Sequence, residues 1–554
     1  MPKLPKNKKS VPGESDIALL AWLAACVSIF TFLFYFKNGE VLLYGDAVAH
    51  INIARRVFDS KTPGLLQLGT VWLPLPHLLM IPFLISRAAW QSGAGGSLPS
   101  LIAYAFAVAG IFRLVRGALS FPADPDRESR LAAWFAAVIF AANPNLIYLQ
   151  STAMTEPLYL ALFIWAIVYL EEFTQALAAR NEESGAVRSS LRKCSLCLAA
   201  AALTRYDGWF ASVFVAVAAI VIALVAGEAV DRAEWRRAVR DFLLVVAAAP
   251  AIWLAYNWII YRNPLEFANG PYSARAIEKR SAAPGLPLHP GSYNVFAAGQ
   301  YFLKSAESNL SEGILQKVLI GVAILGSILC LLVERRLVPL LLLWLPLPFY
   351  ALSIAYGGVP IFVPTWWPFS YYNVRYGIQL LPAVATFFAV SVYFLTTLAR
   401  SPTGKAAVTA LAAAVVIASY ASVWRAQPVS FREAWVNSRS RVALERTLAV
   451  NLRKLPPEAT LLMYLGDRVG ALQRAGIPLS RVIQEGNHRT WKQPSDPEGL
   501  WERALANPAA LADYAISIGD DQVARSARQH ALPALVIVET TGQPPATIYS
   551  THKP

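Results

Sequence analysis

The chain has 554 residues, of which 56% are hydrophobic and 15% are charged, and its mean hydropathy is +0.43. A soluble globular protein carries about 25% charged residues, so this composition excludes a purely soluble protein and predicts an α-helical, polytopic membrane protein. The net charge of +14 does not indicate nucleic-acid binding, because the basic residues fall in short clusters between apolar runs, as cytoplasmic loops of membrane proteins do.

The first apolar run begins at residue 17, after a basic segment that covers 1–16. The run is about 20 residues long, which is enough to span a bilayer. No small-residue cleavage site ends it, so a removable signal peptide is not expected. We therefore expect a cytoplasmic N-terminal tail over 1–16, followed by an uncleaved membrane helix.

The sequence predicts about 11 transmembrane helices. They are 17–36, 99–117, 131–149, 156–172, 194–206, 209–226, 242–261, 314–333, 337–355, 376–399 and 406–424. The run 71–90 is also apolar, but it holds three prolines, and each interior proline costs a helix about 3 kcal/mol. If this run does not cross, the basic clusters between helices face the cytoplasm, so we expect it to lie in the outer interface.

This topology gathers several polar segments on the external face. The first external loop is 37–98, the next external turn is 150–159, and a long external loop covers 262–313. The turn 204–209 and the segment 357–377 reach the same side. The N-terminus is then inside and the C-terminus outside.

After residue 424 the chain becomes polar enough to be soluble. The segments "ATLLMYLGD", "ADYAISIGD" and "ALVIVETTG" are typical of buried strands that end in turns. We expect a transmembrane domain over 17–424 and a small extracytoplasmic α/β domain over 425–554. Asp467, Glu485 and His488 lie near its strand ends, but no nucleotide-binding or catalytic-triad motif occurs there, so this domain is interpreted as an acceptor-side or structural module.

Two acidic residues lie close to lipid, where charge is costly and needs a reason. They are Asp46, just past the first helix, and Glu156, at the start of another. Asp46 could instead cap the helix that follows it, and Glu156 could instead stabilise the first turn of its helix. Asp46 and His50 are four residues apart, so a helix could present both to a metal ion together with Glu156. The alternative for His50 is an ordinary interfacial histidine.

Five segments carry a family resemblance. They are "YGDAVAHINIARRVF", "LGTVWLPLPHLL", "TEPLYLAL", "ALTRYDGW" and "NVRYGIQLLPAVA". In this order they resemble the GT-C membrane glycosyltransferases, and above all the branch of protein O-mannosyltransferases and aminoarabinose transferases, that is, glycosyltransferase family 39 and its relatives. The resemblance covers about residues 17–425. It implies a GT-C fold and an enzyme that takes a sugar from a polyprenyl-phosphate carrier on the external face of the membrane.

The resemblance also implies roles for two acids. An acid of the first external loop, here Asp46, acts at the acceptor, and the acid of the next external turn maps to Glu156. The family often has two adjacent acids where this chain has Asp46 followed by Ala47, which argues against a metal ion held by two carboxylates. No cofactor is therefore expected, and a divalent metal stays an open alternative.

The chemistry points to arginines as well. A lipid phosphate, with a second pKa of about 6, is already a good leaving group and needs positive charge more than an acid. An acceptor hydroxyl needs its proton removed, which Asp46 could do while arginines hold the phosphate, with inversion by direct displacement. Arg375 is the first candidate for the donor phosphate, followed by Arg205, Arg55 and Arg56. Each of these arginines could instead pair with an acid or anchor a helix at the interface.

Candidate substrate-binding residues complete the prediction: His50, His77, Tyr372, Tyr376, Trp366 and Trp367. The aromatic residues could stack on sugar rings or simply form an interfacial belt, and His77 could serve only in packing.

The sequence thus predicts a glycosyltransferase of the bacterial inner membrane with a periplasmic C-terminal domain. Its partners would be a polyprenyl-phosphate sugar, a glycan, lipid or protein acceptor, and membrane lipids. The alternative is a transporter or flippase of lipid-linked sugars. Transporters often show internal repeats and broken helices at the bilayer midplane. No repeat is visible and the polar groups gather at one face, which favours the enzyme.

Overall fold

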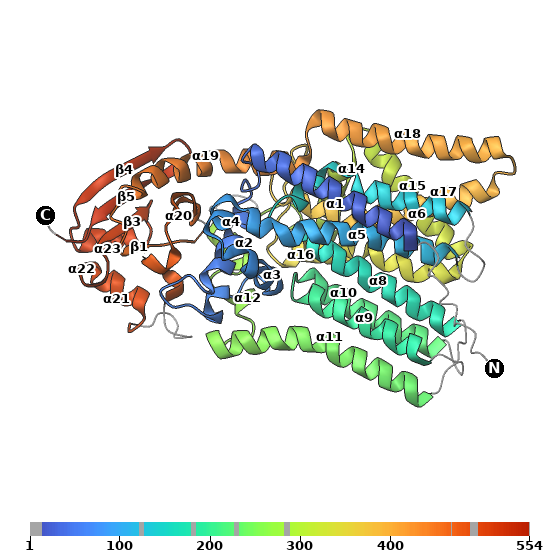
Figure 1. Cartoon of the computed structure of the whole chain (residues 1–554), viewed down its shortest axis with the longest axis horizontal. Coiled ribbons are helices and arrows are strands. Elements are labelled where there is room, and N and C mark those ends of the chain that lie inside the picture. The colour runs from blue at the N-terminus through green and yellow to red at the C-terminus, as the bar shows by residue number, and fades with distance from the viewer. Residues whose placement is uncertain are drawn as a thin grey trace, which may run out of the picture.

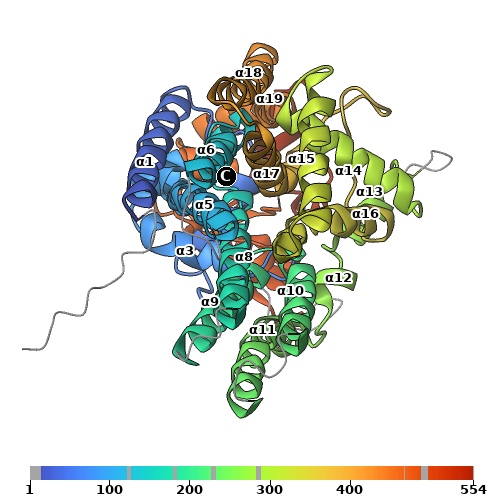
Figure 2. The same cartoon turned by 90° about the vertical axis from the view of Figure 1, so that its right-hand side faces the viewer.

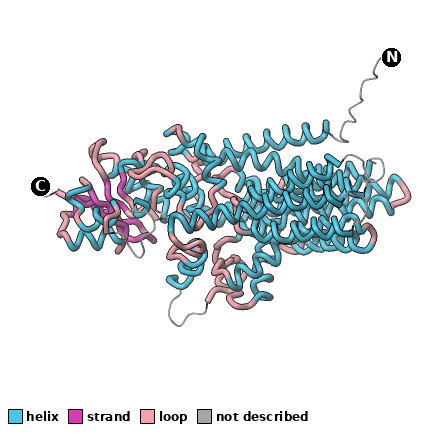
Figure 3. Tube along the Cα trace, turned by 90° about the horizontal axis from the view of Figure 1, so that it is seen from below, coloured by secondary structure: helices cyan, strands magenta, loops and turns pink. Residues whose placement is uncertain are grey.

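The computed structural model describes residues 14–120, 127–178, 184–225, 232–281, 288–466, 468–487 and 497–552. Most of the predicted N-terminal tail lies outside these residues, as do Asp467 and His488. The chain forms a long helical bundle with a small sheet at one end, near the C-terminus (Figure 1). Figure 3 shows that the strands are confined to that end and that the bundle is built from helices.

The bundle consists of long apolar helices. Their bounds are α1 Glu14–Lys37, α5 Ala94–Ser120, α8 Glu156–Ala178, α9 Ser184–Ala202, α10 Asp207–Val225, α11 Arg232–Tyr261, α15 Leu315–Leu332, α16 Pro346–Tyr356, α17 Leu381–Leu398 and α18 Pro402–Ala426. Among the described residues, nine helices are long and apolar enough to cross a membrane, or ten if one bent pair counts as a span. The protein is therefore a multi-pass membrane protein.

The helix α9 and the bent pair account for the difference between the predicted eleven crossings and the nine found among the described residues. The first turns of α9 carry Arg188, Arg192 and Lys193, so its composition is less apolar than that of its neighbours. It nevertheless packs along α8 and α11 (Figure 2).

Two predicted helices are not continuous. The segment 131–149 is split into α6 Arg127–Ala141 and α7 Pro144–Gln150, which meet at 61°. The break occurs because Asn143 caps α7 by accepting hydrogen bonds from two backbone N–H groups, and Pro144 takes the first helical position. The segment 337–355 begins as a 3-10 helix, η3 Arg335–Trp344, before α16. The prediction of one straight helix over 131–149 was wrong, whereas Arg336–Tyr356 still forms one candidate membrane span, as predicted.

Further helices precede, follow or connect those of the bundle along the chain. They are α2 Gly45–Arg56, η1 Leu65–Leu68, α3 Leu75–Leu84, α4 Arg87–Ser92, α12 Glu266–Asn269, α13 Ala274–Ser281, α14 Val295–Leu310 and η4 Val374–Leu380. The predicted interfacial run 71–90 contains α3, whose ten residues span about 15 Å, half the thickness of the hydrocarbon core. This helix is too short to cross the membrane, in line with the expected interfacial position.

The C-terminal part is an α/β layer that α19 Val429–Leu452 joins to the bundle. The strand order is β2-β1-β3-β5-β4, with β1 parallel to β2 and β3, and with β5 antiparallel to β3 and β4. The strands are β1 Leu461–Met463, β2 Val482–Ile483, β3 Tyr514–Ile518, β4 Ala534–Thr540 and β5 Gln543–Ser550. The accompanying helices are α20 Gly470–Ala475, η5 Leu479–Arg481, η6 Glu485–Asn487, α21 Leu500–Ala506, α22 Pro508–Leu511 and α23 Gln522–Gln529. The predicted α/β class of this region is confirmed.

Close packing of α15 on α17 yields a stability prediction. A Cβ atom added at Gly326 would overlap the carbonyl oxygen of Phe387, whereas one added at Gly321 would meet no atom within 4 Å. We expect Gly326→Ala to separate the helices and lower the free energy of unfolding by about 1–3 kcal/mol. Thermal unfolding of purified protein in detergent measures this loss. The matched Gly321→Ala variant should unfold at or above the wild-type temperature, and equal losses would contradict close packing as the cause.

Candidate functional site

A buried arginine lies at the end of the bundle that faces the C-terminal sheet. Arg375 is 5% exposed and reaches three carboxylates from three separate helices. Its Nε donates to Glu156 Oε1 at 3.2 Å, its Nη1 donates to Glu433 Oε1 at 2.9 Å, and its Nη2 donates to Asp46 Oδ2. Its backbone N–H also donates to Glu433 Oε2 at 3.1 Å. One guanidinium therefore joins α2, α8 and α19.

The backbone around Arg375 is fixed by α14. Gly377 packs directly on α14, where a Cβ would overlap the backbone of Ser305 and Ala306. Ser305 Oγ and Asn309 Nδ2 each donate to the carbonyl oxygen of Val374 at 2.7 Å. These contacts hold η4 in place and so determine where the arginine points.

A second arginine extends the network. Arg205 follows α9 and contacts Asp207 Oδ2 at 3.2 Å through Nε and Glu156 Oε1 at 3.4 Å through Nη1. Its Nη2 donates to the Tyr350 hydroxyl at 2.8 Å, and that hydroxyl donates to Asp207 at 3.1 Å. The ring of Tyr376 lies 5.1 Å from the Arg205 guanidinium and 4.9 Å from that of Arg375. We call the following six residues the ion cluster: Asp46, Glu156, Arg205, Asp207, Arg375 and Glu433.

Asp46 differs from the other acids of the ion cluster in its exposure. The side chain of Asp46 is 42% exposed, whereas those of Glu156, Asp207 and Glu433 are 3% exposed or less. Asp46 lies in the first turn of α2, whose N-cap is Tyr44, so the alternative that it caps this helix is wrong. Its Oδ1 accepts no hydrogen bond from any described residue. Asp46 is thus fixed by Arg375 through Oδ2, while its Oδ1 lies at the surface of the ion cluster.

The two predicted histidines bind each other. His50 Nδ1 lies 2.9 Å from His77 Nε2, and the His50 ring lies 4.7 Å from that of Trp72. Burial lowers the pKa of His50 to about 3 and holds the pKa of His77 well below its usual value, so both rings are neutral. Within the described part of the chain, no group of three His, Cys, Asp or Glu side chains is arranged to hold a metal ion. The arrangement does not support a metal ion shared by Asp46, His50 and Glu156, because the two carboxylates face Arg375.

Arg55 and Arg56 lie at the other end of α2, about 15 Å from Asp46 by helical rise. Arg55 pairs with Asp59 at 2.8 Å and donates to the carbonyl oxygens that link α3 to α4. Arg56 Nη1 donates to Gln484 Oε1 at 3.1 Å, and its buried Nε has no partner among the described residues. These two arginines attach α2 to its surroundings and do not enter the ion cluster.

Of the predicted aromatic residues, Tyr376 contacts both arginines of the ion cluster. Partial burial raises the pKa of the Tyr372 hydroxyl, and the Asp46 carboxylate lies close enough to help raise it. Tyr372 and Trp367 are 45% and 48% exposed, and Tyr372 forms an isolated antiparallel bridge with Phe362. The ring of Trp366 packs edge-on against Tyr301 with centroids 5.1 Å apart.

Sequence reasoning missed Glu433 and Tyr350 as parts of the site. Asp207, in the quoted motif "ALTRYDGW", was expected only as a possible ion-pair partner of Arg205, and this pair is present. Glu433 falls in the region interpreted as the soluble domain, although an acid in "VSFREAW", directly after a membrane helix, was a usable signal. Tyr350 lies inside an apolar run and gave no signal.

The buried contact of Glu433 yields a second prediction. Replacing this residue with glutamine removes a charge that compensates Arg375, and loss of one member of a buried pair costs about 3 kcal/mol. We expect Glu433→Gln to lower the thermal midpoint clearly. Asp520→Asn is the matched control, because its pair with Arg528 is exposed and should contribute nothing measurable. Wild-type stability in Glu433→Gln would show that Arg375 does not depend on this carboxylate.

The neutral histidine pair yields a third prediction. The pKa of His50 is about 3 in the folded protein and 6.5 in the unfolded chain, so the unfolded chain binds more protons between these values. The stabilisation is complete above pH 6.5 and falls as the pH decreases towards 3, by about 2 kcal/mol at pH 5. Unfolding at pH 7.5 and pH 5 should show this loss in the wild type and a smaller one in His50→Gln. The exposed His530→Gln should keep the wild-type pH dependence, and an unchanged dependence in His50→Gln would contradict the assignment.

Comparison with known proteins identifies the fold. No protein-family model and no curated protein matches this sequence. Two crystal structures of ArnT, an aminoarabinose transferase from Cupriavidus metallidurans, are similar to the chain. The apo structure has a TM-score of 0.57 and 12% identity over 97% of this chain and 98% of ArnT. The structure bound to undecaprenyl phosphate has a TM-score of 0.58 and 13% identity over 98% and 99%. This likeness shows that the chain has the GT-C fold, as its motifs predicted.

Proposed function

We propose that this protein transfers a sugar from a polyprenyl-phosphate-linked donor to an acceptor hydroxyl at the external face of the membrane. The observation that carries the proposal is Asp46, a partly exposed carboxylate whose Oδ2 is held by the buried Arg375 while Oδ1 is free to accept a proton. The GT-C fold supports the reaction class, because the similar structures are of a transferase and one of them holds undecaprenyl phosphate.

The reaction needs one base and one electropositive site. Asp46 takes the proton of the acceptor hydroxyl while the hydroxyl oxygen attacks the anomeric carbon of the sugar. The bond between this carbon and the phosphate oxygen breaks, and the phosphate leaves with the bonding electrons. Direct displacement from the opposite side inverts the anomeric centre.

Arg375 couples the base to the leaving group. A guanidinium has five N–H donors, and the three side-chain contacts of Arg375 leave two of them without a partner among the described residues. The proton transfer removes the negative charge of Asp46 in the same step in which the phosphate gains charge. Arg375 then loses its attraction to Asp46 and can stabilise the phosphate, with Arg205 beside it. Glu156, which is fully buried behind both arginines, acts as a positioning residue.

We also propose the orientation. The first turns of α9 and α11 carry arginines and lie at the end of the bundle opposite the sheet (Figure 1). The positive-inside rule assigns this end to the cytoplasm of a bacterial inner membrane and the C-terminal domain, residues 425–554, to the periplasm. The domain boundaries 1–16, 17–424 and 425–554 belong to the same proposal.

The decisive test is sugar transfer by purified protein in liposomes, with a panel of polyprenyl-phosphate hexoses and pentoses and with cell-envelope fractions as acceptors. We expect Asp46→Asn to lower kcat about 100-fold or more and to keep donor binding, because a positioned base contributes about 10²–10⁴-fold. Glu40→Gln, an acid of the same external loop outside the ion cluster, is the matched control and should keep full activity.

Equal transfer by Asp46→Asn and wild type would exclude Asp46 as the base. The same liposomes also separate the enzyme from the flippase. Movement of lipid-linked sugar between leaflets with no product formed from any donor would contradict the proposed transferase and support transport.

A further inference from the structure

A second polar feature lies at the end of the bundle opposite the ion cluster. A pocket of about 540 Å³ opens between α9 and α11. Its wall on α9 includes Arg188, Ser189 and Arg192, and its wall on α11 includes Asp241 and Phe242. The proposed reaction at the external end does not use these side chains.

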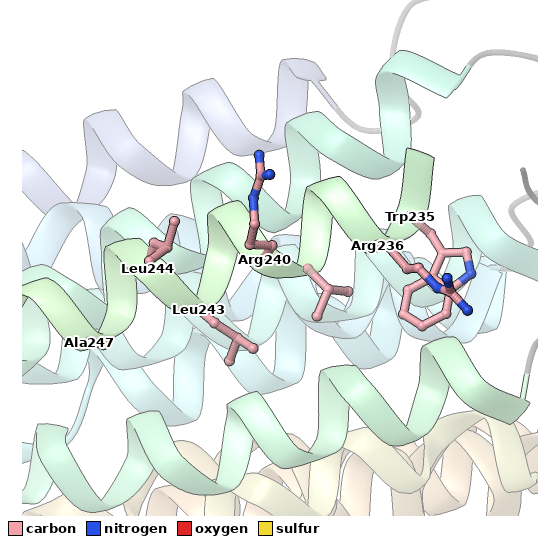
Figure 4. Close-up of a pocket in the computed structure, with 7 residues that line it drawn as sticks. Trp235, Arg236, Arg240, Leu243, Leu244 and Ala247 are labelled. Carbon is pink, nitrogen blue, oxygen red and sulfur yellow. The ribbon is translucent and has the colours of Figure 1, made fainter. Parts of the chain in front are cut away.

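A second pocket, of about 460 Å³, runs along the neighbouring face of α11. Figure 4 shows the side chains that line it, spread along one stretch of this helix from Trp235 to Ala247. The end near the start of α11 carries Arg236 and Arg240, and Leu244 lies further along. The surface of this open depression is almost entirely apolar, although two of the residues that form it are arginines.

The charges of the two pockets are unbalanced. Their described lining contains four arginines, namely Arg188, Arg192, Arg236 and Arg240, against the single carboxylate of Asp241. This carboxylate is shared, since it lies 3.4 Å from Arg188 and 2.8 Å from Arg240. The pockets thus present an excess of positive charge that would attract an anion.

The position of the arginines matches the depth of lipid headgroups. Arg188 and Arg192 lie within about 13 Å of the start of α9, and Arg236 and Arg240 lie equally close to the start of α11. Beyond them the lining becomes apolar, with Leu243, Val245 and Ala247. Trp235 at the basic end is a residue type that anchors helices at the membrane surface.

We propose that the cytoplasmic ends of α9 and α11 bind one anionic phospholipid of the surrounding bilayer. Its phosphodiester lies between the arginines of the two helices, and an acyl chain follows the apolar part of the α11 pocket past Leu243 and Leu244. Basic pockets between membrane helices on the cytoplasmic side suit such headgroups. A zwitterionic lipid would bring a quaternary amine next to the arginines and so bind less well.

The site also accounts for the unusual composition of α9. Its arginines exclude it from the helices that are apolar enough to span a membrane on composition alone. A bound phosphodiester would neutralise part of this charge and hold α9 against α11 at a fixed height in the bilayer.

The test is native mass spectrometry of the purified full chain, offered equal amounts of phosphatidylglycerol and phosphatidylcholine with identical acyl chains. We expect retention of phosphatidylglycerol by the wild type. The Arg188→Gln/Arg192→Gln variant should bind it at least tenfold more weakly, because each basic residue near an anionic lipid contributes about fivefold. The matched control is Arg400→Gln/Lys405→Gln, which removes two charges at the same end of the bundle and should bind like the wild type.

Equal retention of both lipids by the wild type would overturn the proposal. This comparison needs no variant, so it tests the proposal even if a variant fails to fold. Equal loss in the two double variants would show attraction by general surface charge, which also contradicts a defined site. Displacement of phosphatidylglycerol by an equal concentration of inorganic phosphate would indicate a site for free anions and not for a lipid. None of these measurements depends on sugar transfer. The lipid proposal can therefore be tested even if the proposed function is wrong.

Discussion

The burial of the Arg375 guanidinium is the constraint on which the sheet-facing end of the bundle depends. A buried charge is costly unless it is paired, with an effective penalty of several kcal/mol per ion. Here the pairing is supplied by Asp46 from α2, Glu156 from α8 and Glu433 from α19. Displacing any one of these helices would leave the Arg375 charge less well paired. The contacts of this one side chain therefore hold α2, α8 and α19 together.

The same constraint creates a chemical difference among the carboxylates. Glu156 and Glu433 are enclosed and can serve only to hold Arg375, and in the case of Glu156 also Arg205. The side chain of Asp46 is partly exposed, so another group can reach it and replace its contact with Arg375. In the proposed reaction the base loses its attraction to a neighbouring cation when it binds the proton, and Asp46 is the acid of the ion cluster whose exposure would allow an acceptor to approach. The enclosed acids of the cluster would then position Asp46.

The sequence predicts the fold and four of the six residues of the ion cluster for identifiable reasons. Asp46, Glu156, Arg205 and Arg375 are charges close to long apolar runs, and such charges are rare enough in lipid to be conspicuous. Glu433 could not be paired with Arg375 because no local pattern links residues 58 positions apart. The strand β5 was missed for a local reason, since its sequence "QPPATIYS" begins with two prolines, which remove backbone donors. The bend between α6 and α7 was visible in Asn143-Pro144, which is a typical helix start.

The two ends of α9 relate the depth of the ion cluster to the bilayer. Arg188 and Ala202, the last residue of α9, are 14 residues apart, a helical rise of about 21 Å, which is most of the ~30 Å thickness of the hydrocarbon core. Arg205 follows three residues later, so an Arg188 among the headgroups of one leaflet would leave Arg205 towards the opposite boundary of the core. In the proposed reaction, this is the depth at which the phosphate of a polyprenyl carrier would lie, while the acceptor would approach Asp46 from the aqueous side.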